Sequence, residues 1–158
     1  AYARMKDVEL EVPFATLFAS PLAKLGLQGD AGRIVYELGL ISPEYERLAK
    51  GKAASADARS AFLAGVAAGS VKGLTAPDSM ARAIAPAFTD PVLPDDIAEL
   101  VRQKRIGEAI LQAMARIESG VRGELVKVTE GLSVLRKLGL EDVARRTALQ
   151  LMLLERRG

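Results

Sequence analysis

The chain has 158 residues, of which 49% are hydrophobic and only 4% aromatic, and it contains no His, Cys or Trp. Its length suffices for one domain with a hydrophobic core, while the missing imidazole and thiol remove the commonest general base, metal ligand and strong nucleophile. A net charge of +2 gives no reason to expect nucleic acid or an anionic membrane as a partner.

The N-terminal stretch predicts a change from extended to helical structure. Residues 8–12 alternate between apolar and acidic side chains, which favours an extended arm or one short strand. Phe14, Phe18 and Leu22 then recur every four residues, the spacing of one helix face. Pro21 is expected to break this helix.

Three helix starts follow. Ser42 before Pro43 and an acidic residue has the pattern of an N-cap with Pro at the first helical position. Asp57, together with Ser55, and Asp78 precede the next two helical patterns. Acidic or hydroxyl side chains at these places satisfy backbone N–H groups in the first helical turn.

Small residues recur within the longest apolar run, which extends from residue 61 to 71. Gly65, Gly69 and Gly73 are four residues apart, which predicts either a groove for another helix or a thin helix buried within its own fold. The run is too short to cross a bilayer, so we expect no membrane span.

A linker at residues 89–94 contains two prolines, and all seven aromatic residues precede it. The two halves are therefore expected to have different cores. We predict an N-terminal arm over 1–13, a helical subdomain over 14–89 and a helical-hairpin repeat region over 95–158. One continuous domain over 14–158 remains the alternative.

The C-terminal region has the clearest helical periodicity. An apolar stripe that begins at Ile97 would reach charged residues if continued in phase, so a turn is expected near residues 103–107. Two more helices follow, separated at Gly139, and the last runs from Glu141 to Leu154. The whole chain is thus predicted to be all-α, with about eight helices packed as a short α-solenoid or a multi-helix bundle.

Two similar hairpins are separated by 35 residues, measured from Ala109 to Ala144. Leu135, Gly139 and Ala144 fall where a tetratricopeptide repeat has a large residue, a turn glycine and a small residue. The C-terminal region therefore resembles a degenerate tetratricopeptide-like hairpin array. This resemblance implies stacked hairpins and a concave groove for a partner segment. An ordinary bundle of similar hairpins is the alternative.

The last helix is apolar on nearly all sides, so it requires cover from a neighbouring helix, a second subunit or another part of the chain. Its candidate interface residues are Leu149, Leu151, Met152, Leu153 and Leu154. We therefore predict a non-enzymatic protein-interaction or scaffolding module that binds a protein partner or self-associates. Simple burial within a bundle is the alternative for this helix.

One carboxylate suggests an alternative function. Glu118 lies in an Ile-Glu-Ser context near a helix end, which resembles the setting of the catalytic acid in lytic transglycosylases. A carboxylate-dependent, glycan-cleaving enzyme is therefore the second hypothesis. However, no aromatic residue follows Glu118 to stack on a sugar, and an ion pair with Arg122 is the simpler expectation.

The remaining charged groups favour structural roles. Asp95 and Asp96 could hold a cation, but their place after Pro94 suits a helix N-terminus better. Arg145 and Arg146 each follow an acidic residue by four positions, the favourable order for surface ion pairs. We therefore expect no cofactor, no metal site and no nucleic-acid partner.

The cellular compartment stays open. A chain without Cys fits the cytoplasm and equally a cysteine-poor protein of the bacterial periplasm. The sequence starts at Ala1 rather than Met, so the chain could be one domain of a larger bacterial protein.

Overall fold

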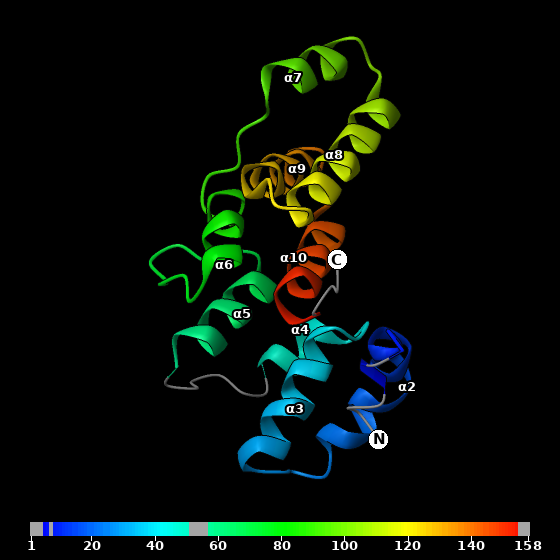
Figure 1. Ribbon diagram of the computed structural model, residues 1–158, viewed down its shortest axis with the longest axis vertical. Helices are drawn as coiled ribbons and strands as arrows, with labels where there is room; N and C mark the ends of the chain where they lie inside the picture. The colour runs from blue at the N-terminus through cyan, green and yellow to red at the C-terminus, as the bar shows by residue number, and fades with distance from the viewer. Residues whose placement is uncertain (1–4, 7, 51–56, 155–158) are drawn as a thin grey trace.

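The computed structural model describes residues 5, 6, 8–50 and 57–154, and within these residues it contains helices and no strand (Figure 1). The predicted all-α class is confirmed. The helices are α2 (Glu11–Ala23), α3 (Gly29–Leu40), α4 (Tyr45–Lys50), α5 (Ala58–Ala68), α6 (Ser79–Ile84), the 3₁₀ helix η1 (Ala85–Phe88), α7 (Asp95–Arg102), α8 (Ile106–Val121), α9 (Leu125–Lys137) and α10 (Glu141–Leu153).

Helix α2 begins earlier and ends later than the sequence pattern suggests. It starts at Glu11, so the extended conformation expected over residues 8–12 is wrong. Glu9, with φ of 55°, turns the chain just before the helix. Pro21 does not interrupt α2; it lies in the last turn, and the helix ends two residues later at Ala23.

Two of the predicted helix starts are confirmed and one differs. Asp57 and Asp78 cap α5 and α6 by accepting hydrogen bonds from first-turn backbone N–H groups at 2.9 and 2.8 Å. Ser55 lies outside the described residues. Ser42 instead joins two helices, because its hydroxyl donates to the Gly39 carbonyl at 2.7 Å and accepts from the Glu44 N–H at 3.2 Å. Helix α4 consequently begins at Tyr45.

The three spaced glycines do not share a helix face. Gly65 lies in α5, whereas Gly69 ends that helix with φ of 92° and Gly73 forms a later turn with φ of 79°. A Cβ placed on Gly65 would lie 2.8 Å from the Ser70 carbonyl oxygen, so the small residue lets the chain fold back closely. The groove for another helix is therefore wrong, and the thin helix is buried within its own fold.

One hydrophobic core spans the linker. Residues 89–94 contain no helix, as expected. The main cluster of buried side chains nevertheless includes Phe62, Ile84 and Phe88 before the linker, and Val128, Leu132 and Leu149 after it. Arg136 of α9 fixes this junction by donating to the Ala87 carbonyl at 2.9 Å and lying 4.7 Å from the centre of the Phe88 ring. The expectation of two different cores is therefore wrong.

Helices α8 and α9 approach each other through glycines. A Cβ on Gly131 would lie 2.6 Å from the Ala113 carbonyl oxygen, and a Cβ on Gly120 would lie 2.5 Å from Val128 Cγ2. The turn expected between α7 and α8 is present, with Lys104 at φ of 60°. Figure 1 shows α7 at one end of the molecule, α2 and α3 at the other, and α10 between them.

Candidate functional site

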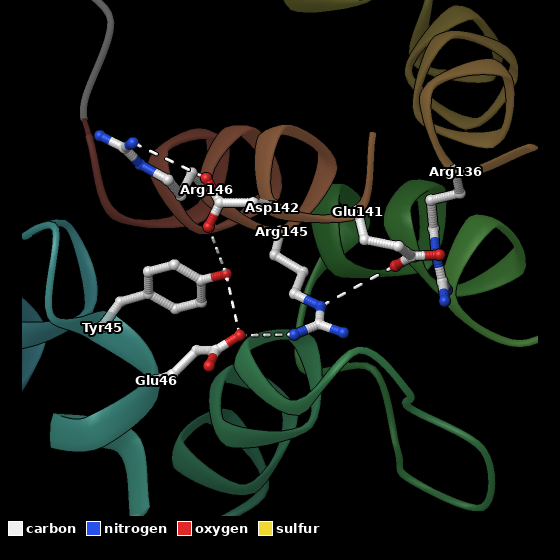
Figure 2. A network of polar contacts seen from close by, with 7 residues as sticks. All are labelled: Tyr45, Glu46, Arg136, Glu141, Asp142, Arg145 and Arg146. Carbon is white, nitrogen blue, oxygen red and sulfur yellow. Dashed lines mark hydrogen bonds and ion pairs between the residues drawn. The ribbon is translucent and has the colours of Figure 1, made fainter. Parts of the chain in front are cut away.

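Seven side chains form a polar cluster where α4 meets α10, with Arg136 contributed by α9 (Figure 2). We call it the α4–α10 cluster; it comprises Tyr45, Glu46, Arg136, Glu141, Asp142, Arg145 and Arg146. The Tyr45 hydroxyl donates to an Asp142 oxygen at 2.9 Å, and Arg145 Nη1 donates to Glu46 Oε1 at 2.7 Å. These two contacts join residues almost a hundred positions apart and hold α4 against α10.

The charges of this cluster balance. Three carboxylates face three guanidinium groups, and Arg136 Nε lies 3.1 Å from Glu141 Oε2. The two ion pairs expected along the last helix are confirmed: Arg145 lies 3.9 Å from Glu141, and Arg146 lies 3.8 Å from Asp142. Because every charge has an opposite neighbour, the cluster offers no excess charge to attract an ionic substrate.

Tyr45 acts as a hydrogen-bond donor in this cluster. Burial, followed by the hydrogen bond to Asp142, raises the pKa of Tyr45 to about 12. The phenol therefore stays protonated at neutral pH and cannot serve as a general base there. The chemistry of the cluster is that of a clamp between two helices.

Two open hollows adjoin the cluster. One of about 280 Å³ is lined mainly by alanines of α4 and α5 with Glu46, Lys50 and Arg145 at its rim, and a second of about 580 Å³ lies over Tyr45 and Asp142. The described residues contain no group of three or more acidic side chains that could hold a metal ion. Nor do they include a helix long and apolar enough to cross a membrane.

Glu118, the residue of the enzymatic alternative, lies on the surface of α8. Its side chain is 66% exposed, and Arg122 Nη1 donates to it at 2.5 Å. The expected ion pair is thus confirmed. This carboxylate is therefore not enclosed in an apolar pocket of the kind that surrounds the catalytic acid of lysozyme-like glycosidases.

Asp95 and Asp96 occupy the first turn of α7, where acids suit the helix N-terminus. Asp96 accepts a hydrogen bond from Arg116 of α8 at 2.5 Å, and this contact lowers the pKa of Asp96. Arg116 also pairs with Glu130 of α9 at 2.9 Å. Arg116 therefore links three helices through its ion pairs with Asp96 and Glu130.

The candidate interface on the last helix is internal. Leu149, Leu151 and Met152 are buried within the main core, and Leu153 and Leu154 are half-buried. The last two pack against a small cluster formed by Ala15, Leu38 and Ile41. The cover that this helix requires thus comes from the chain itself, and these five residues do not form an exposed surface.

An exposed apolar stripe lies instead on α2. It consists of Leu10, Phe14, Leu17, Phe18 and Leu25, which we call the α2 face. Leu10 and Phe18 are 45% and 46% exposed, and Leu17 and Leu25 are 68% and 64% exposed. The rings of Phe14 and Phe18 lie 4.8 Å apart, centre to centre. At 3.6 residues per turn, Phe14, Leu17 and Phe18 fall within an arc of about 100°, while Leu10 and Leu25 flank the two ends of α2.

These apolar side chains are exposed because α2 packs onto α3 through its small residues. Ala15 and Ala19 are fully buried, and Ala15 contacts Leu38 and Ile41. Phe14 is half-buried against this cluster, whereas Leu17 and Phe18 remain exposed. Sequence reasoning overlooked this surface, although one signal was present: residues 12–23 contain no charged side chain.

A hollow of about 430 Å³ lies on another side of α2, between α2, α3 and α4. Its lining includes Lys24, Tyr36 and Arg47, but Arg47 is already paired with Glu44 and donates to Ser20 at 2.9 Å. The hollow is open to solvent, and of its two cations Arg47 is already paired, so it provides no defined ligand site.

Comparisons with protein-family models, with curated proteins and with solved structures found no match to the chain.

Proposed function

We propose that the chain is a non-enzymatic interaction module that docks another protein surface on the α2 face. The observation that carries this proposal is the concentration of exposed apolar side chains there. Four of the thirteen large hydrophobic residues that are exposed in the described chain belong to the α2 face, and Val8 and Leu27 lie two residues before and after it. Contiguous exposed apolar patches of this kind mark interaction sites in soluble proteins.

The rest of the fold suits a rigid scaffold for such a surface. Consecutive helices α7–α8 and α9–α10 pack as hairpins, and the repeated small residues Ala109 and Ala144 are both fully buried at their packing surfaces. This arrangement supports a tetratricopeptide-like hairpin array as part of the proposal. The α4–α10 cluster clamps the array to the N-terminal helices that present the α2 face.

Affinity capture from native lysate, followed by mass spectrometry, tests the proposal. The baits are the unchanged chain, Leu17→Glu and Thr16→Glu. Thr16 is also exposed on α2 but lies about 100° around the helix from Leu17 and outside the arc of the α2 face, so Thr16→Glu introduces the same charge beside that face rather than on it. Circular dichroism melts establish that all three baits are folded.

We expect a protein that is recovered with the unchanged chain and with Thr16→Glu but is lost with Leu17→Glu. A partner retained equally by all three baits would refute docking on the α2 face. Recovery of no partner by any bait, from a chain that is also monomeric, would refute an interaction module.

A further inference from the structure

We infer that the occupant of the α2 face is the α2 face of a second copy of this chain, with the two helices antiparallel about a twofold axis. This inference rests on the proposed function, because it names the partner of the same surface. Three properties of α2 lead to it: the symmetry of its apolar positions, the distribution of charge along it, and its area.

The apolar positions are symmetric about the midpoint between Leu17 and Phe18. Leu10 and Leu25 are equally far from that midpoint along the chain, and so are Phe14 and Pro21. Leu25 lies in the turn that follows α2, where its N–H bonds to the Leu22 carbonyl at 3.1 Å. A twofold interface brings each patch against itself, so a self-symmetric stripe is what antiparallel pairing requires.

The charge distribution favours the same arrangement. Residues 12–23 carry no charge, so neither a strongly acidic nor a strongly basic partner is selected along the stripe. The exposed Glu9 lies just before α2, and the exposed Lys24 lies just after it. Antiparallel pairing places each Glu9 near the other copy's Lys24, and it also opposes the two helix dipoles. A parallel arrangement would bring like charges together.

The area suits a modest dimer. The exposed large side chains between residues 8 and 27 form an apolar patch on the order of 500 Å². A stable interface buries about 800 Å² on each partner. The smaller side chains along the rim of α2 would supply the remainder, so we expect a reversible dimer rather than an obligate one.

Sedimentation equilibrium of the full chain is the first test. The unchanged chain and Thr16→Glu are expected to dimerise alike. In a twofold interface the Leu17→Glu substitution is present once from each copy, so it places two carboxylates in an apolar contact. We expect it to raise the dimer dissociation constant by more than about tenfold. A dimer that Leu17→Glu does not weaken would overturn the inference.

Cross-linking tests the antiparallel geometry, and the absence of native Cys makes it unambiguous. Leu10→Cys and Leu25→Cys chains are given tags of different mass and treated with a short bis-maleimide. We expect mixed dimers of the two variants to cross-link, while neither variant cross-links efficiently with itself. Efficient self-linking of Leu10→Cys would indicate parallel pairing and overturn the inference.

If the unchanged chain is monomeric, the inference that a second copy occupies the α2 face is wrong. Two further measurements then show whether another occupant binds there. If lysate capture still loses a different protein with Leu17→Glu, the docking surface stands and its occupant is that protein. If the monomer instead sediments with phosphatidylglycerol vesicles and Leu17→Glu does not, the occupant is a lipid surface. If neither occurs, the proposed function fails as well.

Discussion

Replacing Gly131 with Ala is expected to destabilise the protein, although the same change stabilises most helices. In an unhindered helix interior, Gly→Ala stabilises by about 1 kcal/mol. At Gly131 the new Cβ would lie 2.6 Å from the Ala113 carbonyl oxygen and 2.5 Å from Ile117 Cγ1. Ordinary contact requires about 3.5 Å, so α8 and α9 would have to separate by about 1 Å.

That separation disturbs packed side chains along both helices, and overpacking of this kind costs about 1–3 kcal/mol. After subtraction of the gain of about 1 kcal/mol in helix propensity, the net loss is about 0–2 kcal/mol in the free energy of unfolding. For a chain of this size, the melting temperature would fall by up to about 6 °C.

The assay is urea unfolding followed by far-UV circular dichroism, with Gly107→Ala as the matched control. Gly107 lies in the first turn of α8, the helix against which Gly131 packs, but a Cβ placed there meets no atom within 4 Å. We expect Gly107→Ala to be neutral or to stabilise by up to about 1 kcal/mol. If Gly131→Ala proves as stabilising as Gly107→Ala, then α8 and α9 do not approach as closely as described.

Three further changes probe other parts of the fold. Asp57→Ala removes the cap of α5 and should cost about 1 kcal/mol in urea unfolding. Leu149→Ala, in the core shared across the linker, should cost about 2–5 kcal/mol, whereas Leu111→Ala at an exposed site should change stability by less than about 0.5 kcal/mol. Equal costs at these two positions would contradict the shared core. The pKa of Tyr45 is raised from 10.0 to about 12 in the folded protein. Tyr45 therefore contributes fully to the free energy of unfolding below pH 10, and this contribution is lost as the pH rises toward 12. Tyr45→Phe, which lacks the hydrogen bond to Asp142, should flatten this part of the stability profile, measured by unfolding at stepped pH.

Local patterns predicted the helices where one face is buried and a cap or turn residue marks the end. The phase shift after Ile97 located the turn before α8, and Asp57 and Asp78 located two helix starts. Pro21 was predicted to break α2, but it lies within the last turn and the helix ends two residues later, at Ala23. Such a detail depends on where a helix ends, which periodicity alone defines poorly.

Tertiary contacts were the part that sequence could not supply. An apolar last helix requires cover, but its composition does not say whether the cover is another helix or another molecule. The structure shows Leu149 and Met152 inside the core. Conversely, the pattern of Phe14 and Phe18 marked an apolar face of α2 without showing that α3 packs beside it rather than over it. The candidate surface therefore became visible only from side-chain exposure.

The alanine seam between α2 and α3 also determines how α2 behaves in the folded state. Burying alanine methyl groups releases less apolar surface from water than burying leucines, so α2 is held less firmly than the core helices. Its backbone amides should accordingly exchange with deuterated solvent through local opening, well before the whole chain unfolds. If two copies pair through this helix, only the closed form of α2 can pair, so dimerisation shifts the local opening equilibrium toward the closed form. The local order of α2 would then depend on protein concentration, and hydrogen exchange would report assembly at the level of a single helix.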